Sequence, residues 1–505
     1  MPDKKISFQP RWTIPITFVG VLVAGLVLRI CLAITFPNIY NPDEVFQTLE
    51  PGHRLATGWG IVTWEWRAGI RSWLVPGILA GLMSLVGGHD ADPQRYLILI
   101  NIVLSLASLS IVAVAGAAGR RVAGIEGLAI AGAVSAGWYD LVYFGPKTLT
   151  EVIAANTLVV SVYLATVVAA NGMSAARRRL FFVLLGCLLG LTFWLRFQLA
   201  PALPVIAGWA CRGKVKECWL PLISGAAIPL SAYGLVDWLT WGTPFQSVWK
   251  NTWINIVENR SATYGTAPLN WYILELAGLW RWAFVLILVA ACVSVRRLPL
   301  FALASAIIIG SMSLVPHKEI RFIFPAIALI IVLAGVGTAL IVERLRLLFW
   351  PAGPIWLPSS LAISAWLLTS AVIAIRGSWP GLHGFSPYVI QAETYLYKRP
   401  DICGLGLLGV HWSGTSGYTR LNRPVPITDF MTINDFETHA SSVNWLLASA
   451  DLISTQKMKA LLDRDDIPKF AILQCWSKVC VMHREGACTP MHGWDINKQL
   501  SDRNW

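Results

Sequence analysis

The first long apolar run of the chain, IPITFVGVLVAGLVLRICLAITF at residues 14–36, is long enough to cross a lipid bilayer as a helix, because a span needs about 20 mostly apolar residues. Similar runs recur along the sequence, so that 55% of the 505 residues are hydrophobic and only 13% are charged. Soluble proteins carry about 25% charged residues. The composition therefore predicts a polytopic membrane protein. The first run is longer than a signal-peptide core and lacks a small-x-small cleavage site, so we expect it to stay uncleaved.

The apolar runs predict an all-α bundle of about eleven membrane-spanning helices. A further apolar stretch at residues 73–86 is short and contains a proline, which favours a re-entrant or interfacial segment. The expected spans are 14–36, 95–117, 122–142, 150–170, 179–195, 197–211, 218–238, 271–293, 298–314, 321–342 and 355–375.

Basic residues gather in alternate loops, as the positive-inside rule requires of cytoplasmic loops. The N-terminal side carries Arg120–Arg121, Arg177–Arg179, Arg212–Lys216, Arg296–Arg297 and Arg344–Arg346, whereas the opposite side carries the acidic loops and every candidate reactive group. We therefore predict a cytoplasmic N-terminus and an exoplasmic site. The net charge of +12 is spread over these short clusters, which argues against a nucleic-acid partner.

The composition changes after Arg376, where polar residues rise and apolar runs shorten to the size of single strands and helices. This change predicts a transmembrane domain at 1–375 and a small exoplasmic α/β or α+β domain at 376–505, a common domain size. In an oxidising compartment its cysteines 403, 475, 480 and 488 predict one or two disulfides. Free buried thiols are the alternative, and a zinc site is the least favoured. Cysteines 31, 187, 211, 218 and 292 are expected to be small core residues.

The first exoplasmic loop, residues 37–94, begins with NPDEVFQTLEPGH at 41–53. Asp43 and Glu44 are adjacent and cannot share one helix face, so one can act as a base while the other braces a neighbouring backbone or arginine. The alternative is that Pro42–Glu44 only starts a helix, because prolines and acids are favoured in a first turn.

Four further residues of this loop, Glu50, His53, Trp64 and Trp66, predict a sugar- or acceptor-binding surface. An aromatic face matches the apolar face of a pyranose, and the polar groups beside it supply hydrogen bonds. The alternative is an interfacial tryptophan belt, which is common in membrane proteins.

A second group of charges lies in VPHKEIRFIFP at 315–325, at the exoplasmic mouth between two spans. His317, Lys318 and Arg321 predict a site for a lipid-borne phosphate, with Glu319 orienting one of the cations. The alternative is snorkelling anchors at a helix end. Arg196 interrupts apolar sequence on the same side of the membrane and must find water, a carboxylate or a ligand phosphate.

In this order, the stretches NPDEVFQTLEPGH, TWEWRAGIRS, DWLTWGTPF, YGTAPLNWY and PHKEIRF, spanning residues 41 to about 325, resemble the lipid-phosphate-mannose-dependent α-mannosyltransferases that build N-glycan precursors and GPI anchors. The resemblance implies a GT-C membrane fold, a polyprenyl-phosphate sugar donor and inversion at the anomeric carbon. It implies that Asp43 is the base, with Glu44 beside it, and that His317 and Lys318 bind the donor phosphate. The family commonly has His before the Pro-Asp-Glu, where this chain has Asn41, so this position lacks the ionisable group that the resemblance implies.

The partners expected from this resemblance are the lipid bilayer, the donor and a glycan or glycolipid acceptor, without a metal or other cofactor. Two Asp-x-Asp pairs, at 90/92 and 463/465, are interpreted as solvated turns. A transporter or flippase for lipid-linked sugars and an inactive scaffold are the alternative functions; transporters usually carry internal repeats, and none is visible here. Short cytoplasmic loops favour a bacterial inner membrane over the ER membrane, and the oligomeric state is left open.

Overall fold

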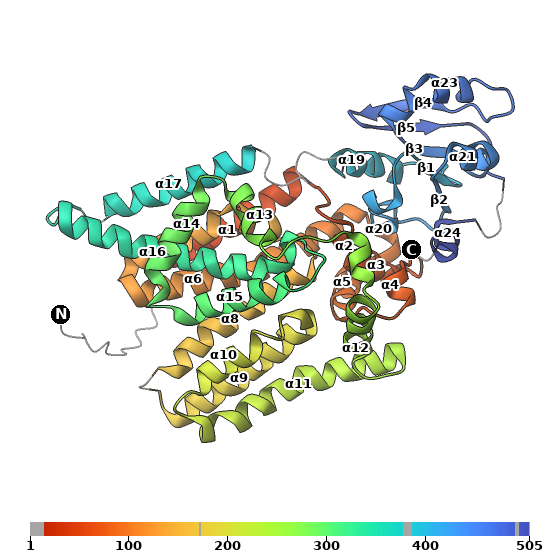
Figure 1. The fold of residues 1–505 in the computed structure, drawn as a ribbon. Helices are drawn as coiled ribbons and strands as arrows, with labels where there is room; N and C mark the ends of the chain where they lie inside the picture. The colour runs from red at the N-terminus through yellow and green to blue at the C-terminus, as the bar shows by residue number, and fades with distance from the viewer. Residues whose placement is uncertain (1–14, 171–172, 355, 377–385, 490–493, 504–505) are drawn as a thin grey trace. The chain divides into compact units, whose positions relative to one another are not determined.

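The computed structural model describes residues 15–170, 173–354, 356–376, 386–489 and 494–503 (Figure 1). The basic N-terminal residues 4, 5 and 11, the start of the first expected span and the linker at 377–385 lie outside this part of the chain. The chain forms two compact units: unit 1 comprises Met1–Cys31, Val103–Leu235 and Thr252–Ser378, and unit 2 comprises Leu32–Ile102, Val236–Asn251 and Trp379–Trp505.

Unit 1 is built mainly from apolar helices of different lengths, and α1, α6 and α11 continue past its boundary. They are α1 (Ile16–Thr35), α6 (Pro93–Gly137), α7 (Tyr139–Phe144), α8 (Thr150–Ala169), α9 (Ala175–Leu195), α10 (Leu203–Cys211), α11 (Val215–Trp241), α13 (Trp271–Trp280), α14 (Ala283–Val295), α15 (Pro299–Ser313), α16 (Phe324–Phe349) and α17 (Trp356–Ile375).

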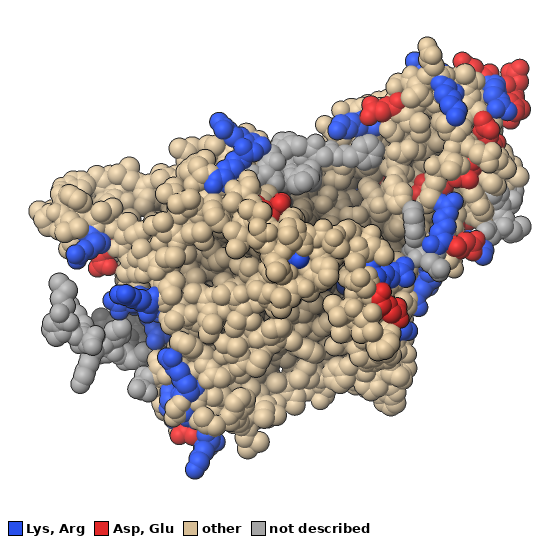
Figure 2. All heavy atoms as spheres, in the orientation of Figure 1, with Lys and Arg blue, Asp and Glu red and all other residues tan. Residues whose placement is uncertain are grey.

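Among the described residues, seven helices are long and apolar enough to cross a membrane, or up to eight if the bent pair α13 and α14 is one span. This confirms a polytopic membrane protein but gives fewer long helices than the eleven expected. The expected spans 197–211 and 298–314 contain α10 and α15, which have only 9 and 15 residues. Figure 2 shows few charged side chains over the helices, and Lys and Arg gathered at the end where α9 and α11 begin.

The helix α6 accounts for two of the expected spans. Its backbone leaves the helical region at Ala123 and Gly124, which separates the segments expected at 95–117 and 122–142. A Cβ atom added to Gly119 would lie 2.0 Å from the carbonyl oxygen of Gly127. The two halves therefore pack against each other through glycines, and the positive φ of 66° at Gly124 lets the chain turn between them.

The helix α16 forms the centre of unit 1, because 83% of its most apolar stretch is buried inside the protein, compared with 11% for α1. Small residues on α16 allow its neighbours to approach closely. A Cβ atom on Gly337 would lie 1.7 Å from the carbonyl oxygen of Ala290 on α14. Close helix contacts through small residues are typical of membrane bundles, where dispersion contacts drive helix association.

Unit 2 combines the first loop, the end of α11 and the C-terminal residues. Its helices are α2 (Pro42–Glu44), α3 (Glu50–Thr57), α4 (Trp64–Arg67), α5 (Leu74–Leu85), α12 (Gln246–Thr252), α19 (Ser386–Tyr397), α20 (Tyr418–Leu421), α21 (Ile433–His439), α22 (Ala450–Ile453), α23 (Gln456–Leu462) and α24 (Ile496–Asp502). Its strands are β1 (Leu405–Leu408), β2 (Ile427–Phe430), β3 (Trp445–Ser449), β4 (Ala471–Trp476) and β5 (Val479–His483).

The five strands form one mixed sheet in the order β2-β1-β3-β5-β4. β1 pairs parallel with β2 and β3, and β5 pairs antiparallel with β3 and β4. Side chains alternate between its faces, as strand geometry requires. Leu405, Leu407 and Leu447 belong to one buried cluster, whereas Leu446 and Ala448 belong to another. The expected small mixed domain is therefore present.

The first loop contributes to the core of this sheet. Val45, Phe46 and Ile61 belong to the same buried cluster as Leu405 and Trp445. The ring centroids of Phe46 and Trp412 lie 4.8 Å apart, edge to face. The sheet and the first loop thus share one hydrophobic core, which sequence position alone did not indicate.

The cysteines of the C-terminal region pair as Cys403–Cys488 and Cys475–Cys480, which confirms the expected disulfides. The other five cysteines were expected to be small core residues, and this prediction was wrong in part. Cys211 and Cys218 are buried but paired with each other across the loop between α10 and α11. Cys31 and Cys292 are exposed rather than part of the core, on helices whose outer faces are apolar.

The packing of α14 against α16 can be tested with two glycines. Gly337→Ala should destabilise the protein by about 1–3 kcal/mol, because the added methyl group overpacks a close backbone contact. Gly310→Ala on α15 is the matched control, since a Cβ atom there meets nothing within 4 Å, and it should leave stability unchanged or raise it by up to about 1 kcal/mol. Thermal unfolding of detergent-purified protein measures both; equal stability of the two variants would contradict the packing.

Candidate active site

The helical segment that begins at Pro42 carries the two adjacent acids. The backbone N–H of Asp43 donates to Oδ1 of Asn41 at 3.0 Å, and Asn41 is extended, so it caps the segment. The interpretation of Pro42–Glu44 as a helix start therefore describes the backbone correctly. A helix start does not explain the different surroundings of the two side chains, because Glu44 is buried and Asp43 is only partly buried.

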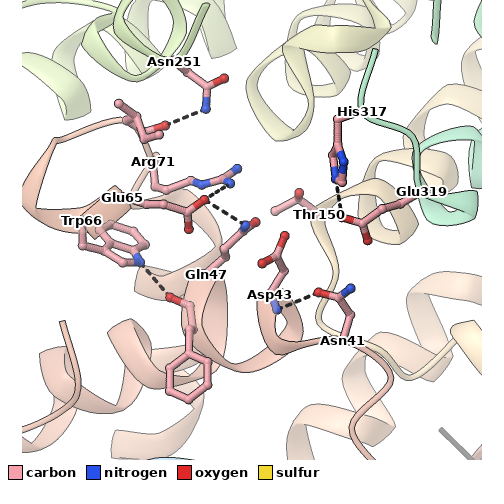
Figure 3. Close-up of polar contacts among 12 residues, drawn as sticks. Asn41, Asp43, Gln47, Glu65, Trp66, Arg71, Thr150, Asn251, His317 and Glu319 are labelled. Atoms are coloured by element: carbon pink, nitrogen blue, oxygen red, sulfur yellow. Dashed lines mark hydrogen bonds and ion pairs between the residues drawn. The ribbon is translucent and has the colours of Figure 1, made fainter. Parts of the chain in front are cut away.

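The two acids diverge as expected for neighbours on a helix. Oε2 of Glu44 accepts a hydrogen bond from the backbone N–H of Tyr40 at 3.0 Å. Glu44 thus braces the backbone just before the segment. Asp43 emerges on the same side as Gln47, one turn further along (Figure 3). The segment continues through a π-helical turn, Val45–Leu49, into α3; such turns recur at functional sites.

A second acid from the first loop lies on the Gln47 side of this segment. Glu65 Oε1 accepts from Nε2 of Gln47 at 3.3 Å and from a guanidinium nitrogen of Arg71 at 2.5 Å (Figure 3). The side chains of Arg71 and Glu65 are 19% and 14% exposed. Partial burial strengthens this ion pair relative to a surface pair. The first loop therefore presents Asp43 together with a fixed carboxylate–guanidinium pair.

Trp66 packs inside unit 2 rather than presenting a face. It is 5% exposed, and its indole N–H donates to the carbonyl oxygen of Phe46 at 2.9 Å. Its ring centroid lies 4.5 Å from that of Trp73 and 6.1 Å from that of Trp241. These contacts give Trp66 a structural role. Trp64 is only partly buried, so it suits a sugar platform better.

Two residues of α12, which follows the DWLTWGTPF stretch, bond to the backbone just before Arg71. Gln246 donates to the carbonyl oxygen of Gly69 at 3.3 Å. Asn251, labelled in Figure 3, donates to the carbonyl oxygen of Ile70 at 3.2 Å. Asp237 is fully buried and accepts from the backbone N–H and hydroxyl of Ser247 at 2.8 and 2.7 Å. Asp237 therefore bonds to the first turn of α12.

Glu50 and His53 are both fully buried. Glu50 accepts from the backbone N–H groups of Ile61, Tyr418 and Thr419, and His53 contacts the side chain of Asn422. These contacts join the first loop to the C-terminal region. A structural role explains both residues, in place of the sugar contact expected from the sequence.

In unit 1, a buried carboxylate links two of the candidate cations. Glu151 is 1% exposed, and its Oε1 accepts from Arg196 at 3.0 Å and from Arg321 at 3.1 Å. Arg321 also donates to both oxygens of Glu319, at 2.8 and 2.9 Å. Bidentate pairing of this kind fixes the guanidinium plane. Arg196 has thus found a carboxylate, one of the three partners expected for it.

His317 and Lys318 lie next to this network but differ in their surroundings. The ring of His317 contacts Oε1 of Glu319 at 3.2 Å (Figure 3) and the carbonyl oxygen of Gly265 at 3.0 Å. The ammonium group of Lys318 donates to the carbonyl oxygens of Ala267 and Val315 at 2.8 and 2.7 Å. Lys318 is 8% exposed, so it holds the loop in shape.

The charges and hydrogen bonds of this cluster shift the pKa values of Glu319 and His317. Burial alone would raise the pKa of Glu319, but the charge of Arg321 and the hydrogen bonds from His317 and Arg321 outweigh it and hold that pKa well below its usual range. The hydrogen bond to Glu319 raises the pKa of His317 above its usual value, against the opposing effect of burial. The cluster therefore favours a cationic His317.

The Asp-x-Asp pairs occur in turns. Asp90 ends a short 3-10 turn and contacts His89 at 3.0 Å, with both side chains largely exposed. Asp465 lies 3.7 Å from Lys469 in a surface turn. Within the described ranges, no group of three or more His, Cys, Asp or Glu residues is arranged to hold a metal ion.

Comparison with known proteins identifies the family. Residues 21–377 match the Alg9-like mannosyltransferase family. The chain belongs to this family. A GPI mannosyltransferase 3 from Yarrowia lipolytica is 25% identical over 81% of this chain and 76% of its own length. A GPI alpha-1,2-mannosyltransferase 3 from Danio rerio is 23% identical over 84% of this chain and 76% of its own.

Among solved structures, ArnT from Cupriavidus metallidurans bound to undecaprenyl phosphate shares the fold, with a TM-score of 0.58. It is 12% identical and covers 95% of this chain and 100% of its own. This likeness concerns the fold alone. Together with the family match, it confirms the expected membrane glycosyltransferase architecture for this Alg9-like chain.

The role of Glu151 in this mannosyltransferase family member was missed at the level of sequence. The stretch GPKTLTE at 145–151 contains no feature that singles out Glu151, yet in the structure Glu151 bridges Arg196 and Arg321. The signal was present in Arg196 itself, because an arginine in apolar sequence requires an anionic partner. Which carboxylate it meets depends on how α8, α9 and the 315–325 loop pack.

The raised pKa of His317 predicts a pH dependence of stability. A raised folded-state pKa gives stability that is fully present below the ordinary histidine value of about 6.5 and is lost as pH rises through the folded-state value. From about pH 5.5 to pH 8.5, the unfolding temperature of the native protein should therefore fall more steeply than that of His317→Gln. His89→Gln, at an exposed histidine, is the control and should follow the native protein; identical profiles for all three would contradict the His317–Glu319 interaction.

Proposed function

We propose that this chain transfers mannose from a polyprenyl-phosphate carrier to a membrane-proximal glycolipid, with inversion of the anomeric carbon. The family match over residues 21–377 carries this proposal. The ArnT-like fold supports a lipid-phosphate donor, since the ArnT structure from Cupriavidus metallidurans holds bound undecaprenyl phosphate. The names of the relatives favour an acceptor of the GPI class.

Asp43 is the proposed base for the acceptor hydroxyl. Glu44 is engaged with the Tyr40 backbone, and Glu65 is engaged with Arg71 and Gln47. Asp43 is partly buried in the first turn of the helical segment, and its side chain lies on the same side as Gln47. A single inverting displacement requires one base, whereas retention through a covalent intermediate requires a second carboxylate as nucleophile. One positioned acid therefore suits the proposed chemistry.

Arg196 and His317 are the proposed contacts of the donor phosphate. Their side chains are 11% and 17% exposed, whereas Arg321 is 2% exposed and bound to two carboxylates. Glu151, Glu319 and Arg321 would position these two groups, and Lys318 would keep the loop in shape. Preorganised cations stabilise the negative charge that develops on a leaving phosphate.

The proposed orientation keeps the N-terminus in the cytoplasm and the site on the exoplasmic side, as the distribution of basic loops predicts. The preference for a bacterial inner membrane over the ER membrane rests on short cytoplasmic loops and on the single sequon at 259–261, and it stays a prediction.

Substitution of the proposed base tests this function. Asp43→Asn should lower mannose transfer by at least about 100-fold, because a general base contributes about 10²–10⁴-fold, while the purified protein still elutes as a folded species. The assay uses radiolabelled polyprenyl-phosphate mannose and membranes from cells that lack this protein, which retain the untransformed acceptor.

The matched control is Asp90→Asn, an exposed acid of the same loop, which should leave the rate of transfer unchanged. Unchanged transfer by Asp43→Asn would remove Asp43 from the mechanism. Transfer that is absent from the native protein in this assay would overturn the proposed reaction itself.

The proposed phosphate contacts are tested through the donor. Arg196→Gln and His317→Gln should each lower kcat/KM for polyprenyl-phosphate mannose by about 10²-fold, in the range found when one charge-stabilising donor is removed. Arg297→Gln in a predicted cytoplasmic loop is the control. Native kinetics in both variants would exclude these side chains from phosphate binding.

A further inference from the structure

Glu50 is a buried carboxylate whose hydrogen bonds come mainly from the C-terminal region. It is 0% exposed, and it lies on the same continuous helical segment as Asp43, two turns further along. Its Oε1 accepts from the backbone N–H of Tyr418 at 2.9 Å, and its Oε2 accepts from the N–H and the hydroxyl of Thr419 at 3.0 and 2.6 Å. A further bond, from the N–H of Ile61 at 2.8 Å, comes from the first loop.

Gly417 makes this approach possible. Its φ is +56°, and a Cβ atom there would lie 2.7 Å from the carboxyl carbon of Glu50. Both the backbone conformation and the lack of space therefore require glycine. The segment Gly417–Asn422 is shaped around this one carboxylate.

His53, one turn beyond Glu50, meets the other end of the same segment. Its Nε2 lies 2.9 Å from Oδ1 of Asn422. The Asn422 amide nitrogen donates to the carbonyl oxygens of His89 and Ala91 at 3.1 and 2.8 Å, which fixes the orientation of the amide. His53 therefore donates through Nε2. Asn422 adopts a left-handed conformation with φ +43°, which asparagine tolerates.

Further contacts around the segment support the same attachment. Tyr96 donates its hydroxyl to the carbonyl oxygen of Thr419. The helix α24 adds a second attachment, because Asn497 accepts from the Val62 N–H at 2.8 Å and donates to the Gly60 carbonyl oxygen at 3.1 Å. Arg420 lies close enough to Glu44 for their charges to interact.

We propose that residues 417–422, the clamp segment, position the helical segment that carries Asp43, and that this is the role of the C-terminal domain in the reaction. A buried carboxylate is tolerated only when donors surround it, so Glu50 and the clamp segment must meet in one geometry. Thr419 is then a positioning residue that acts through Glu50. The inference rests on the proposed role of Asp43 in catalysis.

The test uses the full-length protein in detergent micelles and two measurements. Thr419→Val removes the hydroxyl donor but keeps the shape and the backbone N–H. Hydrogen exchange of the backbone amides at residues 45–53 should become about tenfold faster, because a hydrogen bond to a charged group is lost. Exchange in β1 and β3 should stay unchanged. The kcat for mannose transfer should fall about tenfold, with KM for polyprenyl-phosphate mannose unchanged.

Two matched variants complete the test. Thr419→Ser retains a hydroxyl, so its hydrogen-exchange rates at residues 45–53 and its kcat should equal those of the native protein. Thr438→Val removes a hydroxyl on α21 that bonds within its own helix, and it should behave as the native protein. If Thr419→Val does not fold, Asn422→Gly replaces it, since glycine keeps the backbone conformation and removes the contact with His53.

Unchanged exchange at residues 45–53 in a folded variant would overturn the clamp, as would faster exchange spread equally over the whole domain. Faster local exchange with native kcat would overturn its role in positioning. The exchange measurement does not depend on Asp43. If Asp43→Asn transfers normally, the proposed function fails while the exchange result still reports on the attachment.

Discussion

A carboxylate that is removed from water must be surrounded by donors, and two such carboxylates organise the two units of this protein. Glu50 in unit 2 is 0% exposed and is satisfied by backbone N–H groups and a hydroxyl. Glu151 in unit 1 is 1% exposed and is satisfied by two guanidinium groups. Losing either set of donors would leave an uncompensated buried charge, which costs several kcal/mol. Each carboxylate therefore determines which segments of its unit can lie together.

The two buried carboxylates differ in the groups that surround them and in the role that those groups support. The donors that bond to Glu50 are neutral, and such a contact serves as a rigid attachment between the first loop and the C-terminal sheet. The guanidinium groups around Glu151 keep positive charge in place near His317. A site that stabilises a departing phosphate needs cations held in advance. Glu151 and Glu319 in unit 1 thus hold arginine side chains in place. The sequence pattern alone does not distinguish this role of an acidic residue from acid–base catalysis.

The candidate site was predictable to the level of chemical type. Because Asp43 and Glu44 are adjacent on a helix, their side chains were expected to point in different directions. Because Arg196 lies in apolar sequence, it was expected to bind water, a carboxylate or a phosphate. For Trp66 and His53 the sequence predicts sugar contacts, because they stand among acids in one loop, whereas their burial supports a structural role. Both are buried, and the partner of His53 lies 369 residues away along the chain.

The sequence by itself determined the class of protein, the apolar segments and the family, and it predicts the side of the membrane on which the basic loops lie. These properties depend on composition and short-range spacing, since about 20 apolar residues partition into a bilayer whatever surrounds them. Tertiary structure alone decided which acids are buried and which are presented, because burial depends on long-range partners. Glu50 meets Tyr418 across 368 residues, and Arg321 meets Glu151 across 170. A local sequence pattern does not indicate contacts between residues so far apart along the chain. The attachment of the C-terminal sheet to the first loop is therefore evident only in the tertiary structure.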